Sequence, residues 1–276
     1  MSTKSDTADV DNRRFQGEAH KYAAYLETPE GRLRLDLAFA NLKEFLPLAA
    51  APLNALDIGA GTGALALRLA GLGFQVTLLD SSLPMLEIAK LATQKARQTE
   101  RIELKHSSTE HLTKSFPERA FDVIVCHNVL EFVENPSEVL GSAAQLMRDS
   151  SSILSILVRN RAGEVLKAGL QTGDLVAAAN AITAERGNES LYGGSVRLFT
   201  PPELRTMFAA SSLEVVAERG VRVISDYLPP SISPTAEYDR IFELERKLGI
   251  RPEFAAIARY THCLARRADS ITRENA

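Results

Sequence analysis

The 276-residue sequence has two cysteines, little net charge and no apolar run long enough to cross a bilayer. Cys126 and Cys263 lie in apolar, strand-like runs, which favours buried free thiols in a reducing compartment over a disulfide. A bilayer span needs ~18 consecutive apolar residues. Residues 1–14 are polar and lack the apolar core of a secretory signal. We therefore expect a cytoplasmic protein with no membrane partner.

The charge and the histidine spacing exclude further classes of function. A formal net charge of -3 creates no strong field that would attract nucleic acid, so an RNA contact would need a local basic patch. The five histidines show neither H-x-x-x-H nor HExxH spacing, and we expect no metal site. A G-x-S-x-G elbow is also absent from the sequence, which argues against a hydrolase.

Three closely spaced glycines form the most informative motif. Asp57-Ile58-Gly59-Ala60-Gly61-Thr62-Gly63 lies between an apolar strand pattern and a helical pattern. Glycines at such a turn let backbone N–H groups approach a ligand where side chains would clash. The string fits the dinucleotide pattern G-x-G-x-x-G/A, and it also resembles motif I of class I S-adenosylmethionine (SAM) methyltransferases. The turn by itself leaves both cofactors open.

The following segments favour SAM. Gln75-Val76-Thr77-Leu78-Leu79 reads as a second strand and ends in Asp80, whose carboxylate could accept both ribose hydroxyls of either cofactor. Farther along, the string from Phe121 to Pro136 resembles the fourth-strand signature of methyltransferases, in which a buried strand precedes a loop that closes over the methionine end of SAM.

Strand and helix patterns alternate from residue 55 to residue 158, which predicts a parallel sheet covered by helices on both faces. Ligands of such sheets bind outside the carboxyl ends of the strands. We expect a polar segment over 1–28 and one domain over 29–276. Within the domain we expect a helical insertion or lid over 159–198 and a helical excursion over 226–258. Thr200 and Pro201 indicate another helix start.

Beyond the cofactor half, the sequence resembles the bacterial methyltransferases that esterify 5-carboxymethoxyuridine at the wobble position of tRNA. The strings that carry this resemblance are Phe15-x-x-x-Ala19-x-Lys21-Tyr22, Gly31-x-Leu33-Arg34, His127-x-Val129-Leu130-Glu131, Gly220-Val221-Arg222-Val223 with Asp226-Tyr227, and Glu243-x-Glu245 with Arg259-Tyr260-x-His262. The match weakens from 163 to 208. The resemblance implies an α/β, Rossmann-like class I fold with a mostly parallel seven-stranded sheet, and SAM as cofactor.

The resemblance also assigns cofactor contacts by position. Arg34 would bind the SAM carboxylate, Asp80 the ribose and His127 the methionine side. The glycine turn contributes Asp57, Gly59, Ala60 and Gly61. The adenine side falls at Thr109 and Glu110, and Glu110 could accept a hydrogen bond from the exocyclic amine. Ser81 is a further candidate for cofactor binding. Each of these residues also has an ordinary structural interpretation, for example a solvated arginine or a core histidine.

The acceptor determines what other residues are needed. A carboxylate is already ionised at neutral pH and needs orientation, not a general base. Arg222 and Tyr260 are the main candidates for positioning it. Further candidates are Arg159, Tyr192, Arg197 and Arg259. A phenol or alcohol acceptor would need a base, for which His127 and His262 are available.

Several functions remain open from the sequence. The leading hypothesis is methyl-ester formation on tRNA. The main alternative is a small-molecule O- or N-methyltransferase, which the low net charge favours. A non-catalytic SAM-binding or RNA-associated protein and a nicotinamide-dependent oxidoreductase are more distant hypotheses.

Overall fold

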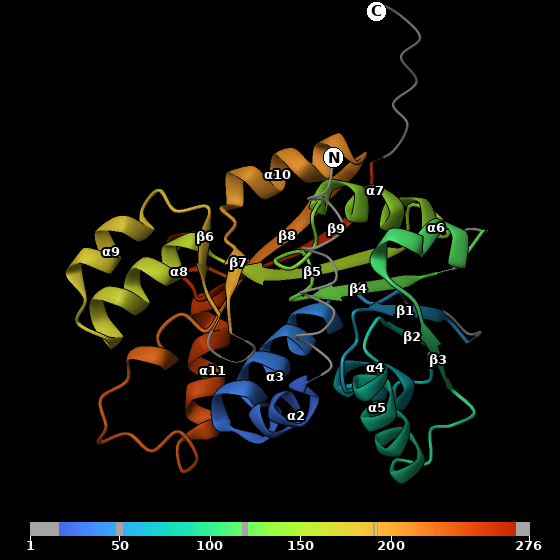
Figure 1. Ribbon diagram of the computed structural model, residues 1–276, viewed down its shortest axis with the longest axis horizontal. Helices are drawn as coiled ribbons and strands as arrows, with labels where there is room; N and C mark the ends of the chain where they lie inside the picture. Colours follow the sequence, from blue (N-terminus) through green and yellow to red (C-terminus); the bar gives the residue numbers. More distant parts are fainter. Residues whose placement is uncertain (1–16, 48–51, 118–120, 190, 192, 269–276) are drawn as a thin grey trace, which may run out of the picture.

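The computed structural model describes residues 17–47, 52–117, 121–189, 191 and 193–268, and Figure 1 shows a central sheet between two layers of helices. The sheet has seven strands in the order β3-β2-β1-β4-β5-β9-β8. They are β1 (Asn54–Ile58), β2 (Gln75–Asp80), β3 (Ile102–His106), β4 (Val123–His127), β5 (Ile153–Arg159), β8 (Leu213–Val221) and β9 (Tyr260–Arg267). The fold class predicted from the sequence is confirmed.

The first five strands run parallel, and β9 pairs antiparallel with both β5 and β8. β1 is adjacent to both β2 and β4, so the strand order reverses at the centre of the sheet. Open α/β sheets bind ligands at such a switch point, outside the carboxyl ends of the strands.

Two sets of helices cover the two faces of the sheet (Figure 1). One set is α3 (Pro29–Lys43), α4 (Ala64–Gly71) and α5 (Leu83–Lys95). The other set is α6 (Leu112–Ser115), α7 (Pro136–Leu146) and α10 (Pro201–Ala210). Each set buries apolar side chains against its own face, such as Leu69 of α4 on one side and Leu140 of α7 on the other. The central strands are apolar on both faces for this reason.

The predicted helix start at Thr200 is confirmed by a capping box. The Thr200 side chain accepts the backbone N–H of Glu203, and the Glu203 carboxylate accepts the backbone N–H of Thr200. Strand β8 ends at Val221, because Arg222 adopts a left-handed φ of 61°. The Glu245 carboxylate then accepts the backbone N–H groups of Val223, Ile224 and Ser225, which replaces the strand ladder.

The described part of the predicted polar segment 1–28 forms mainly one helix. This helix, α2 (Ala19–Glu27), packs beside α3, and its Tyr22 and Tyr25 line a cavity described below. Its charged residues Lys21 and Glu27 are exposed, whereas Ala19 is buried and the two tyrosines are half-buried.

The segment 159–198 is not entirely helical. It contains α8 (Arg161–Leu166), a π-helical turn η2 (Lys167–Gln171), α9 (Leu175–Ala181) and a hairpin of β6 (Arg186–Asn188) with β7 (Ser195–Arg197). The second excursion contains η3 (Ser225–Tyr227), α11 (Tyr238–Gly249) and α12 (Pro252–Ala255). The division of the chain into these units remains a prediction.

Candidate active site

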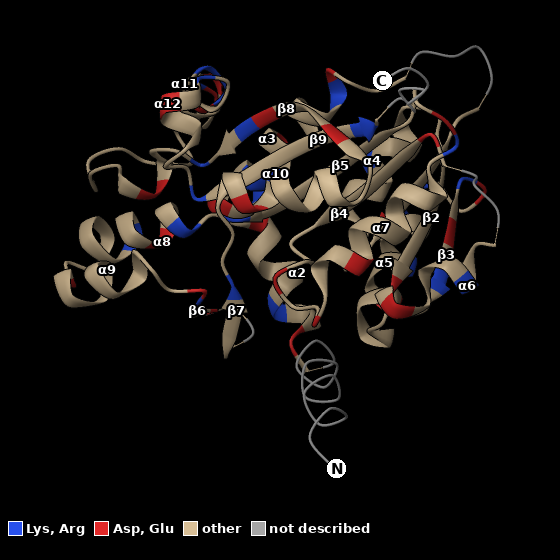
Figure 2. Cartoon of the chain, turned by 90° about the horizontal axis from the view of Figure 1, so that it is seen from above, with Lys and Arg blue, Asp and Glu red and all other residues tan. Residues whose placement is uncertain are grey.

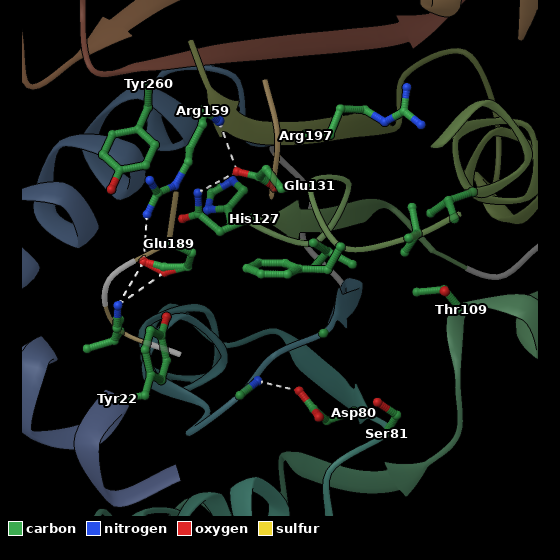
Figure 3. Close-up of a pocket in the computed structure, with 18 of the residues that line it drawn as sticks. Tyr22, Asp80, Ser81, Thr109, His127, Glu131, Arg159, Glu189, Arg197 and Tyr260 are labelled. Atoms are coloured by element: carbon green, nitrogen blue, oxygen red, sulfur yellow. Dashed lines mark hydrogen bonds and ion pairs between the residues drawn. The ribbon is translucent and has the colours of Figure 1, made fainter. Parts of the chain in front are cut away.

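A cavity of about 1670 Å³ lies at the carboxyl ends of the parallel strands. Ten of the predicted site residues line it: Arg34, Gly59, Gly61, Asp80, Ser81, Thr109, Glu110, His127, Arg222 and Tyr260. Figure 3 shows Asp80, Ser81 and Thr109 in one part of this cavity, and Arg159 and Tyr260 in another. Asp57 and Ala60 instead line a small adjoining cavity, which also contacts Arg34, Gly59 and His127.

The turn after β1 requires its glycines. Gly59, Gly61 and Gly63 have φ values of 63°, 55° and 77°, in the left-handed region that side chains rarely adopt. A Cβ on Gly59 would also lie 2.4 Å from Cγ2 of Val129. The backbone of the turn is therefore exposed to the cavity without side chains, as a bound cofactor would need.

Asp80 fixes this turn to the end of β2. Its Oδ2 accepts the Gly61 N–H at 2.7 Å, and its Oδ1 accepts the Ser82 N–H at 2.8 Å. The carboxylate is buried but still lines the cavity, so remaining lone pairs could accept ribose hydroxyls. Burial raises the pKa of Asp80, against the hydrogen bonds from these backbone groups.

Asp57 lies at the end of β1 and is almost completely buried. Burial and the nearby charge of Asp80 raise the pKa of Asp57 to about 8. Its Oδ2 has no hydrogen-bond partner within the described part of the chain. Unsatisfied buried oxygens are rare, so this atom fits a site that a polar ligand completes.

Arg34 enters the cavity from α3 and lies among tyrosines. Its guanidinium carbon is 5.1 to 5.8 Å from the ring centroids of Tyr22, Tyr25 and Tyr260, and its Nη2 donates to the Tyr22 hydroxyl at 3.1 Å. The Arg34 side chain is 8% exposed. This buried cation beside the glycine turn is suited to a carboxylate ligand.

Three further predicted cofactor contacts are Ser81 and the two residues predicted to bind adenine, Thr109 and Glu110. Ser81 follows β2, and Thr109 and Glu110 belong to the short turn η1 (Thr109–His111) after β3. All three line the cavity, and Glu110 is exposed. Their roles toward the cofactor remain predictions.

His127 is linked to His262 within the sheet. Ser155 Oγ lies 2.8 Å from Nε2 of each ring, and Nδ1 of His262 lies 3.3 Å from the Asn41 amide nitrogen. Burial lowers the pKa of both imidazoles, that of His262 to about 3. His127 thus presents a neutral ring to the cavity, and His262 is a core residue with no exposed surface.

The part of the cavity beyond Arg34 is cationic. Four arginines surround the Tyr260 phenol: Arg34, Arg222 and Arg259, which are buried, and Arg159, whose side chain is 12% exposed. Burial alone would raise the pKa of Tyr260, but the charges of these arginines lower it to about 8. Arg222 forms an ion pair with Asp226, and its Nη1 donates to the Tyr25 hydroxyl at 3.1 Å. The predicted pair Arg222 and Tyr260 therefore lies in one cluster.

The model of one protein family, described as methyltransferase domain, matches residues 30–218. The chain belongs to this family. A SAM-dependent methyltransferase, predicted from the glycine turn and its context, is thereby confirmed, with SAM as cofactor.

Two curated relatives differ in their acceptors. The methyltransferase is 27% identical over 265 residues to the tRNA 5-carboxymethoxyuridine methyltransferase of Escherichia coli K12, covering 95% of this chain and 98% of that one. It is 28% identical to a ubiquinone biosynthesis O-methyltransferase of Paracidovorax citrulli, covering 79% of this chain and 87% of that one. A solved Burkholderia thailandensis 1,6-didemethyltoxoflavin-N1-methyltransferase has a TM-score of 0.63, 19% identity and coverage of 98% and 92%, and supports the fold.

Sequence reasoning missed several residues that line the cavity of the methyltransferase, among them Tyr22, Tyr25, Glu131 and Glu189. Glu131 follows β4 in the string His127-x-Val129-Leu130-Glu131, and it is 2% exposed. Its Oε1 accepts the backbone N–H of Arg159 at 2.9 Å, and its position in that string was the available signal. Tyr192, a predicted positioning residue, lies outside the described residues.

Across the described residues, no group of three or more His, Cys, Asp and Glu side chains is arranged to hold a metal ion. No described helix of the methyltransferase has the length and apolar character needed to cross a membrane. Cys126 and Cys263 are buried free thiols, as predicted.

Proposed function

We propose that this methyltransferase forms a methyl ester on a carboxylate of its acceptor, and that the acceptor is 5-carboxymethoxyuridine at the wobble position of tRNA. The arginine cluster around Tyr260 carries the proposal, because it provides a buried cationic environment in the same cavity as the glycine turn. The match to the Escherichia coli tRNA enzyme over nearly the whole of both chains supports this acceptor.

The residues of the donor side fit SAM. Arg34 would bind its methionine carboxylate, and Asp80 would bind its ribose. Thr109 and Glu110 would bind its adenine, with Ser81 as a further contact. The turn from Gly59 to Gly61 would pack against the methionine part of SAM. When bound, SAM supplies an electrophilic methyl group on a sulfonium. The buried Asp57 oxygen and the side-chain-free turn are the structural features that fit such a ligand.

The acceptor side performs orientation and desolvation. A carboxylate arrives ionised, so the protein has no proton to remove, and a displacement at a methyl group depends mainly on alignment. The guanidinium of Arg159 and the neighbouring charges of Arg222 and Arg259 would hold one carboxylate oxygen. The other oxygen is left to form the new bond to the methyl carbon. Burial excludes water, which strengthens these interactions.

A small-molecule acceptor is the second candidate. The net charge of -3 and the mixed charges in Figure 2 give little attraction for RNA. Helix α9 is drawn almost entirely without charge in Figure 2, and its Leu175 and Val176 are 75% and 73% exposed. This uncharged, exposed helix suits a metabolite acceptor better than a phosphate backbone.

Labelled SAM and total tRNA from a strain that lacks the endogenous activity test the proposal. After nuclease digestion, we expect the label in a nucleoside ester that mild alkali releases. Label in an alkali-stable nucleoside, or transfer to a metabolite pool with none to tRNA, would contradict the proposed acceptor.

A further inference from the structure

Glu189 buries a carboxylate of the protein itself inside the cavity. The residue directly follows β6, yet its side chain is only 4% exposed. Its Oε1 accepts a hydrogen bond from Nη2 of Arg159 at 2.8 Å and one from the Leu191 backbone N–H at 3.1 Å. Figure 3 shows Arg159 directed toward Glu189.

Three carboxylates balance the arginines of the cluster, and they are held unequally. Glu164 pairs with both Arg159 and Arg259. Asp226 pairs with Arg222 and lies 4.0 Å from Arg259. Of these three carboxylates, Glu189 forms an ion pair with one arginine, Arg159, in the described part of the chain, and so has the fewest cationic contacts.

The location of Glu189 also makes it the easiest to withdraw. Glu164 belongs to α8 and Asp226 to η3, whereas Glu189 lies on a hairpin whose strand β6 pairs only with β7 in the described structure. Moving Glu189 outward would break few interactions. It would leave Arg159, Arg222 and Arg259 with two carboxylates, Glu164 and Asp226. The cluster would then carry one more net positive charge beside Arg159, which is what an incoming monoanionic carboxylate needs.

We propose that Arg159 is the binding site for the acceptor carboxylate and that Glu189 occupies this site until the acceptor replaces it. This inference rests on the proposed function, since it requires an acceptor that carries a carboxylate. Glu189 then sets specificity, because a neutral acceptor would gain no ion pair in return for the one that it breaks.

The variant Glu189→Gln removes the competing charge and keeps a polar side chain of similar size. The matched control is Glu185→Gln, which makes the same charge change at an exposed position just before the hairpin. We expect the KM for 5-carboxymethoxyuridine to fall at least three-fold in Glu189→Gln and to stay unchanged in the control, with equal SAM affinity in all three proteins. An unchanged or higher KM in Glu189→Gln would overturn the inference.

A binding measurement separates this inference from the proposed function. Phenoxyacetate, a simple aryloxyacetate, is titrated into each protein saturated with S-adenosylhomocysteine. Tighter binding to Glu189→Gln supports the carboxylate site even if no variant methylates 5-carboxymethoxyuridine, in which case the proposed acceptor fails. Equal binding to Glu189→Gln and wild type overturns the site even if tRNA is methylated.

A double variant tests the role of Arg159. Arg159→Gln by itself would leave Glu189 buried without a cation, so it can reduce stability for an unrelated reason. Arg159→Gln combined with Glu189→Gln avoids that buried charge. We expect the gain in phenoxyacetate affinity to disappear in a double variant that melts normally. A gain that persists there would exclude Arg159 as the binding group.

Discussion

The imidazole rings of His127 and His262 lie edge to face, with their centroids 5.1 Å apart and an interplanar angle of 84°. Ser155 joins them through its hydroxyl. Because burial lowers the pKa of both rings, with the neighbouring His262 and Arg34 adding to the effect at His127, both are neutral at physiological pH. A neutral His127 could act as a base toward a phenol, but a carboxylate acceptor does not need one.

Replacing His127 by glutamine distinguishes these acceptors. Loss of a general base typically costs 10²–10⁴-fold in rate. For a carboxylate acceptor the substitution should affect only how the acceptor is oriented. The single-turnover rate of His127→Gln should therefore fall by less than about ten-fold. The measurement uses saturating SAM at pH 7.5. A loss of two or more orders of magnitude would indicate base catalysis and favour an alcohol or phenol acceptor.

His262 makes the stability of the protein sensitive to acid. Its pKa is lowered from 6.5 to about 3, so the unfolded chain binds the proton more readily than the folded one. The contribution of neutral His262 is complete above pH 6.5. It decreases by up to about 1.4 kcal/mol per pH unit as the pH falls toward 3.

Urea unfolding between pH 4.5 and 7.5 tests this linkage with His262→Gln, which retains a polar group for Ser155 and Asn41. We expect the variant to be less stable at pH 7.5, by about 1–3 kcal/mol for the altered buried hydrogen bonds. Its unfolding free energy should also depend less on pH than that of the wild type. Parallel curves for the two proteins would show that His262 does not carry the acid sensitivity.

Arg34→Ala should weaken the binding of S-adenosylhomocysteine by ten-fold or more. A lost hydrogen bond to a charged group costs about 1.5–3 kcal/mol. Arg32→Ala is the control, since Arg32 lies on the same helix with a side chain that is 63% exposed. Calorimetric titration gives both affinities. An unchanged affinity in Arg34→Ala would remove this residue from the proposed cofactor site.

Tyr260 introduces a second pH dependence, at the alkaline side. Its pKa of about 8 means that the phenol ionises above this pH and adds a negative charge to the arginine cluster. We expect kcat/KM for a carboxylate acceptor to fall above pH 8 in the wild type and to stay level up to about pH 9 in Tyr260→Phe. The same alkaline decrease in both proteins would assign it to another group.

The strands, the glycine turn and the helix cap at Thr200 could be predicted because their signals are local. Apolar strand patterns that alternate with helical patterns predict a buried parallel sheet. The turn needs glycines at positive φ whatever surrounds it. Most of the predicted residues gather in one cavity because the carboxyl ends of parallel strands share an edge of the sheet.

The contacts that the sequence did not reveal join segments that are far apart along the chain. Tyr25 reaches Arg222 from α2, and Ser155 links two histidines on separate strands. Glu189 lies in a polar, glycine-containing stretch whose pattern does not distinguish a loop from a short hairpin. Its burial depends on Arg159, which no local pattern of the hairpin contains.

Methyl transfer to a synthetic anticodon stem-loop tests the central claim most directly. One stem-loop carries 5-carboxymethoxyuridine at the wobble position, and an otherwise identical one carries the corresponding carboxamide. Ester formation on a carboxylate predicts an alkali-labile methyl group on the first and none on the second. Equal methylation of both, or methylation at any other position, would contradict it.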